Sequence, residues 1–136
     1  MKKWNLVFGF LFLLAFLATG QYMRRVFLPE YSEALIQRMQ IRSNHIYLLF
    51  IALLNLLAAG VEVPGRYKWS ALGSGGARLL LILAGCCMLV GFWNEHDGNL
   101  THRTYTRLGI FASLGGVSLL MLIKWGESLL PRQQNE

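Results

Sequence analysis

Residues 46–63 read IYLLFIALLNLLAAGVEV, an almost unbroken run of apolar side chains that decides the fold class. Its length is close to the roughly 20 residues that an α-helix needs to cross a hydrocarbon layer about 30 Å thick. In lipid, every backbone N–H and C=O group must find its partner within the protein, which favours a helix for such a segment. The sequence therefore predicts a transmembrane helix here.

Three further stretches of the same kind flank this one, at residues 4–22, 77–93 and 108–125. Hydrophobic residues make up 54% of the chain and charged residues only 15%, whereas soluble domains carry about 25% charged residues. Charges within the four stretches lie only near their ends, and Arg78 is expected to extend its side chain to the headgroups. We predict an all-α integral membrane protein: residues 1–136 form a single domain with four transmembrane helices in an antiparallel bundle.

The first stretch also has the features of a secretory signal peptide, with Lys2 and Lys3 at its start and small residues near its end. Its apolar core is longer than that of a signal peptide, so we expect a retained helix. Four spans place both termini on one side of the membrane. The basic residues divide almost equally between the two sides, and Lys2 and Lys3 favour cytoplasmic termini in a bacterial inner membrane.

The connection between the first two spans, residues 23–44, is the longest one. Pro29 followed by Glu30 resembles the start of a helix, with proline at the first position and an acid in the first turn. Leu35 and Met39 then recur at a spacing of four residues beside arginines. This pattern predicts a short amphipathic helix lying on the membrane surface between helices 1 and 2.

The connection between the second and third spans, residues 62–76, contains a Pro64-Gly65 turn. Its last part, residues 73–76, reads GSGG and predicts a flexible hinge.

The connections after the first and third spans lie on the same side of the predicted bundle, and ionisable residues gather there. All three histidines of the chain fall on this side, together with most of its acids. We expect any function that uses ionisable groups to reside on this face. The candidate residues are Arg42, His45, Glu95, His96, His102 and Arg103.

His45 lies at the boundary between a polar segment and the apolar run, where Ser43 or Asn44 is available as a helix N-cap. The positive end of a helix dipole disfavours a protonated imidazole, so a neutral ring able to accept a hydrogen bond or a metal is expected. A b-type haem needs two axial ligands that face each other, and His45 with His102 is the pair most compatible with that requirement. The chain contains no His-x-x-x-His or Cys-x-x-Cys motif.

Within the spans, Asn55 is the polar residue expected near mid-membrane, where such side chains bond neighbouring helices. The fourth span is rich in small residues that let helix backbones approach one another. Gly109, Ala112, Ser113 and Gly116 are predicted to form its packing face.

These patterns favour a small membrane protein that works as an accessory, assembly or binding subunit, and not as an enzyme. Its expected partners are the lipid bilayer and either a protein partner or further copies of itself. The net charge of +6 is spread around the spans, which favours anionic headgroups over nucleic acid. One alternative is a haem- or metal-binding redox module using His45 and His102. A second is a small interfacial enzyme whose arginines hold an anionic amphiphile.

Overall fold

The computed structural model describes residues 1–27, 33–65, 67–99 and 101–130. Within these residues the chain is helical and has no β-strand. The elements are α1 (Lys2–Tyr22) with a π-helical continuation η1 (Met23–Phe27), α3 (Leu35–Gly60), α4 (Lys68–Asn94) and α5 (Thr104–Leu129). All four long helices are long and apolar enough to cross a membrane. The prediction of an all-α chain with four helices of this kind is confirmed.

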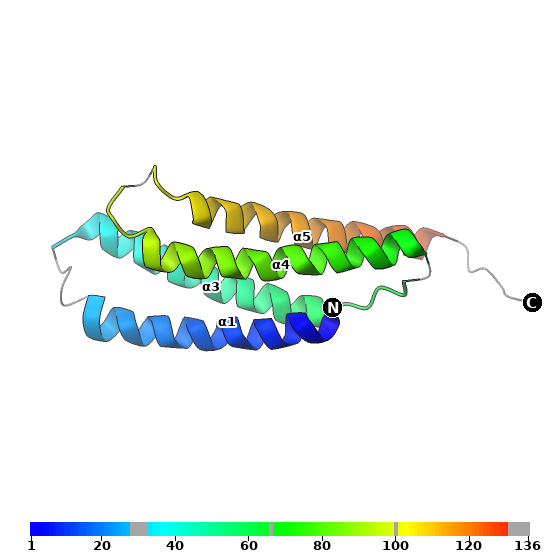
Figure 1. Ribbon diagram of the computed structural model, residues 1–136, viewed down its shortest axis with the longest axis horizontal. Helices are drawn as coiled ribbons and strands as arrows, with labels where there is room; N and C mark the ends of the chain where they lie inside the picture. Colours follow the sequence, from blue (N-terminus) through cyan, green and yellow to red (C-terminus); the bar gives the residue numbers. More distant parts are fainter. Residues whose placement is uncertain (28–32, 66, 100, 131–136) are drawn as a thin grey trace, which may run out of the picture.

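The four long helices lie side by side, and the chain reverses at each connection (Figure 1). α1 packs mainly on α3 and α4 mainly on α5, while α3 and α4 join the two pairs. Asn5 near the start of α1 forms a hydrogen bond with Asn55 near the end of α3. Glu95 just after α4 accepts a hydrogen bond from Thr106 in the first turn of α5. We call the end that holds the connections after α1 and α4 the loop-1/3 end, and the opposite end the loop-2 end.

The apolar core is built around α4, which contributes to each of three buried clusters. The central cluster contains Phe12 of α1, Leu48 of α3 and Met88 of α4. A second cluster lies toward the loop-2 end and a third toward the loop-1/3 end. Their buried members are Ala58, Ala77, Leu81 and Leu120 in the second, and Phe27, Ile41 and Phe92 in the third.

Phe12 of α1 reaches α4 because the residue facing it there, Gly85, has no side chain. A Cβ atom on Gly85 would lie 2.1 Å from Cε2 of the Phe12 ring, far inside van der Waals contact. The Phe12 side chain is only 2% exposed. The glycine thus allows a large ring to fill the space between the two helices, as small residues do at membrane helix contacts.

The predicted packing residues of the last span lie along the inner part of α5. Gly109, Ser113 and Gly116 are buried, and Ala112 is half-buried against the central cluster. A Cβ on Gly116 would lie 2.9 Å from the carbonyl oxygen of Ala77 in α4. The structure therefore places these residues where α5 approaches α4.

The second helix is longer at its start than the sequence indicates. α3 runs without a break over Leu35–Gly60, so the expectation that Ser43 or Asn44 caps it is wrong. Residues 35–44 form the first turns of α3 and not a separate helix. The predicted start of that helix, at residues 29–30, lies outside the described residues. Polar side chains are accommodated in these turns because several of them bond the neighbouring elements, as described below.

The third helix is also longer, and the predicted hinge at residues 73–76 is wrong because α4 already begins at Lys68. A Cβ on Gly73 would lie 2.7 Å from Cδ1 of Ile123, so this glycine allows close contact with α5. The expectation that Arg78 extends to the headgroups also fails. Its side chain is turned inward and bonds backbone carbonyl groups at the end of α3.

Candidate functional site

Glu95, a predicted site residue, is a buried helix cap. It follows the last residue of α4 and is 3% exposed. Its carboxylate accepts hydrogen bonds from the backbone N–H groups of Tyr105 and Thr106 and from the Thr106 hydroxyl. The first N–H groups of a helix have no partner within it, and a negative charge there also interacts favourably with the helix dipole. The end of α4 therefore caps the start of α5.

Asn44 joins this cap to α3. Its side-chain nitrogen donates to the carbonyl oxygen of Gly91 at 3.1 Å. Its Oδ1 lies 3.1 Å from the Thr106 hydroxyl oxygen, whose single proton is donated to Glu95. Oδ1 accepts from the Arg103 guanidinium, which bonds the Ser43 hydroxyl at 2.9 Å as well. We call Asn44, Glu95, Arg103 and Thr106 the polar junction, since together they bond α3, α4 and α5 at the loop-1/3 end.

Gln40 fixes the connection between α4 and α5 one helical turn before Asn44. Its Oε1 accepts from the backbone N–H of Gly98 at 2.9 Å, and its Nε2 donates to the carbonyl oxygen of Asn99 at 3.0 Å. Gly98 adopts a φ of 85°, a left-handed conformation that favours glycine. The connection is therefore shaped by a buried side chain of α3.

The three histidines lie in separate environments. The Nδ1 atom of His45 is 3.0 Å from the Thr19 hydroxyl of α1, and its ring stacks on Phe16 with centroids 4.1 Å apart. His96 lies edge-on to the ring of Phe27. His102 is exposed, and its near partners belong to its own connection: Asn99 at 3.3 Å and Asp97 at 3.9 Å.

No hydrogen bond or ring contact joins His45 to His102, the pair named for the haem or metal alternative, which stays a prediction. The His45 imidazole stacks on the ring of Phe16 in α1, while the near partners of His102 are Asn99 and Asp97 in its own connection. Within the described ranges no group of three His, Cys, Asp or Glu side chains could hold a metal ion. His45 forms part of the contact between α1 and α3.

Of the six candidate residues, the structure brings two together, Glu95 and Arg103, through Asn44 and Thr106. Arg42 and His102 are exposed and remain outside the junction. The sequence reading missed Thr106 and assigned Asn44 only a capping role. A signal for Asn44 was present, because it lies eleven residues before Asn55, which is about three helical turns and the same helix face.

Four exposed arginines lie at the same end of the bundle as the polar junction. Arg24 and Arg25 lie in η1, Arg42 on α3 and Arg107 on α5, and all four are exposed. The exposed acids in the described part of this end are Glu33 and Asp97. We call these four arginines the arginine rim. The loop-1/3 end therefore has a positively charged surface, and the polar junction joins the helices at this end.

A second set of polar contacts joins α1, α3 and α4 nearer the loop-2 end. The Asn5 side chain donates to Oδ1 of Asn55 at 2.8 Å and to the carbonyl oxygen of Arg78 at 3.1 Å. Asn55 donates in turn to the carbonyl oxygen of Leu81 at 3.0 Å. Both asparagines are fully buried. Asn55 thus bonds two neighbouring helices, α1 and α4.

Comparison of the chain with protein-family models, with curated proteins and with solved structures finds no match. The interpretation of the site therefore depends on the residues and contacts described above.

Proposed function

We propose that the four helices cross a bacterial inner membrane as an antiparallel bundle forming one domain, with both termini in the cytoplasm. The first turns of α3 would lie at headgroup level on the opposite side. Two features support this placement: Leu35, Ile36 and Met39 are exposed apolar residues, and Arg42 follows them on the same helix. Such a segment suits an interface where apolar side chains enter lipid and arginines meet phosphates.

We further propose that the protein is an accessory or binding subunit whose working surface is the loop-1/3 end. The observation that carries this proposal is the combination of the arginine rim with the polar junction. The junction holds α3, α4 and α5 together at this end, so the backbone positions of Arg42 on α3 and Arg107 on α5 are set before any partner binds. Preformed charged surfaces give specificity and fast association with partners of opposite charge. An acidic segment of another membrane protein is the partner that this surface suits best.

Replacing two rim arginines tests this proposal. The double variant Arg42→Gln with Arg107→Gln should reduce recovery of a copurifying partner roughly tenfold, because two attractive charges are lost from the surface. The measurement is quantitative mass spectrometry of the protein purified in mild detergent, with native mass determination of the complex.

The matched control is Lys3→Gln with Lys124→Gln, which removes the same charge from exposed positions on α1 and α5 near the loop-2 end. This control should retain the partner. A monomeric protein with no copurifying partner would refute the subunit proposal, as would equal loss of the partner in both double variants.

Orientation is tested by cysteine labelling in a background of Cys86→Ser with Cys87→Ser. Exposed Arg24 and Lys68 lie at opposite ends of the helices, so each is replaced by cysteine in turn. In spheroplasts, a membrane-impermeant maleimide should label position 24 and should label position 68 only after permeabilisation. Labelling of position 68 alone in intact spheroplasts would show that the protein has the opposite orientation. Labelling of positions 24 and 68 in intact spheroplasts would contradict the proposal that α3, which lies between them, spans the membrane.

A further inference from the structure

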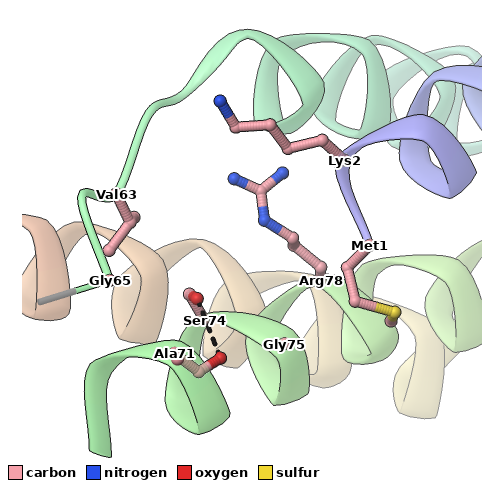
Figure 2. A pocket seen from close by; sticks show the side chains of 8 residues that line it. All are labelled: Met1, Lys2, Val63, Gly65, Ala71, Ser74, Gly75 and Arg78. Atoms are coloured by element: carbon pink, nitrogen blue, oxygen red, sulfur yellow. Dashed lines mark hydrogen bonds between the residues drawn. The ribbon is translucent and has the colours of Figure 1, made fainter. Parts of the chain in front are cut away.

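A cavity of about 260 Å³ lies at the loop-2 end, between the start of α1, the α3–α4 connection and the start of α4 (Figure 2). Lys2 and Arg78 line it, and both side chains extend toward the segment that carries Val63 and Gly65. The other side chains of the lining are uncharged. The other lining residues are Met1, Val63, Gly65, Ala71, Ser74 and Gly75.

Arg78 is a buried cation whose charge is only partly balanced. It is 3% exposed and donates to the carbonyl oxygens of Ala58 at 2.5 Å and Val61 at 2.7 Å. These carbonyls lie at the end of α3, and a helix end contributes about half a negative charge. Among the described residues, no carboxylate forms an ion pair with Arg78. A buried charge without a counter-charge is costly, so the cavity beside it favours an anion.

Lys2 adds a second positive charge to the cavity wall. Its ammonium group lies 2.8 Å from the carboxylate of Glu62, and this contact holds the pKa of Glu62 below its usual range. The Glu62 side chain is exposed, however, and it does not line the cavity. Glu62 is therefore engaged by Lys2 at the surface. The buried carboxylate of Glu127 lies nearby, where it accepts from the backbone N–H of Gly65, but it does not line the cavity and forms no ion pair with Arg78.

We propose that this cavity binds the phosphate group of an anionic amphiphile, namely a phospholipid headgroup. Two of the five N–H donors of Arg78 are used by the α3 carbonyls, and the guanidinium fork matches phosphate oxygens. A water molecule occupies about 30 Å³ of liquid, so the cavity has room for a phosphoryl group with its attached atoms.

The position along the bundle also suits a headgroup. Tyr67 and Trp69 stack on each other at the start of α4, with ring centroids 6.1 Å apart. Aromatic side chains of this kind gather at the membrane–water boundary, where phosphates are found. The site lies at the opposite end from the arginine rim, so it does not depend on the proposed partner binding.

The test measures lipid binding to the full chain in mild detergent by native mass spectrometry. Phosphatidylglycerol should bind at least tenfold more tightly than zwitterionic phosphatidylcholine. Arg78→Gln should weaken phosphatidylglycerol binding about tenfold or more, the effect expected for a charge-assisted hydrogen-bonded contact. Lys2→Gln should weaken it about threefold, because its partly exposed charge contributes less. The control Lys3→Gln removes the same charge from the next residue, which does not line this cavity, and should leave binding unchanged.

A competition experiment with inorganic phosphate distinguishes a site for a phospholipid headgroup from a site that also binds the free phosphate anion. If phosphate displaces phosphatidylglycerol and raises the unfolding temperature of the wild type but not of Arg78→Gln, the cavity is a phosphate site that also takes the free anion. Equal affinities for the two lipids would overturn the proposal. An equal loss of phosphatidylglycerol affinity in Lys2→Gln and Lys3→Gln would overturn it too. The comparison of the two lysines decides the question even if Arg78→Gln fails to fold.

Discussion

Glu95→Ala should lower the free energy of unfolding by about 2–3 kcal/mol, since it removes an N-cap and leaves buried donors without a partner. The donors are the backbone N–H groups of Tyr105 and Thr106 and the Thr106 hydroxyl. Thermal and denaturant unfolding in detergent, followed by circular dichroism, measures the loss. The same change should weaken binding at the arginine rim, because the polar junction beneath it is loosened.

Two further variants isolate the capping role. Glu95→Gln keeps one side-chain oxygen as an acceptor and should lose about half as much stability as Glu95→Ala. Glu33→Ala removes an exposed acid from the same end and should stay within about 0.5 kcal/mol of the wild type. If Glu95→Ala were no less stable than Glu33→Ala, the capping role would have to be abandoned.

Gly85→Ala should separate α1 from α4, because a methyl group at this position overlaps the ring of Phe12. Overpacking of this kind costs about 1–3 kcal/mol, and here the ring is held in the central cluster and has little room to move. The expected result is a lower unfolding temperature together with easier crosslinking of lipid probes to α1.

The control for this substitution lies on the same helix. A Cβ on Gly76 meets nothing within 4 Å, so Gly76→Ala should be neutral or stabilising by up to about 1 kcal/mol. Combining Gly85→Ala with Phe12→Leu should recover part of the loss, because the smaller side chain makes room for the methyl group. Additive effects of the two substitutions would mean that the residues do not share one space.

The number and type of the helices could be predicted from the sequence because long apolar runs in lipid leave little choice but a helix. Their boundaries could not. Residues 35–44 and 68–76 look like connections because they are polar or rich in glycine. They are helical because tertiary contacts accommodate them: Gln40 hydrogen-bonds to the α4–α5 connection, Asn44 hydrogen-bonds to Gly91 of α4, and Gly73 faces α5. Such contacts depend on which helix lies opposite, and one sequence does not show this.

For a similar reason, only part of the candidate site could be predicted from the sequence. The sequence indicated that Glu95 and Arg103 share one end, since topology alone places them there. It did not indicate that the acid is buried as a cap or that Asn44 links the two. The sequence also did not indicate the neighbours of His45, whose imidazole contacts Phe16 and Thr19 of α1.

The pairing of α4 with α5 is held by a carboxylate at each end. Glu95 bonds Thr106 at the loop-1/3 end, and Glu127 bonds the Ser70 hydroxyl and the backbone N–H of Gly65 at the loop-2 end. Glu127 lies near the end of α5, so during synthesis the second of these contacts forms only after α5 has left the ribosome. The first pair, α1 with α3, has its own contacts much earlier. Assembly would thus proceed in two stages. The α1–α3 pair would form first, and α4 would pair with α5 only after α5 is synthesised.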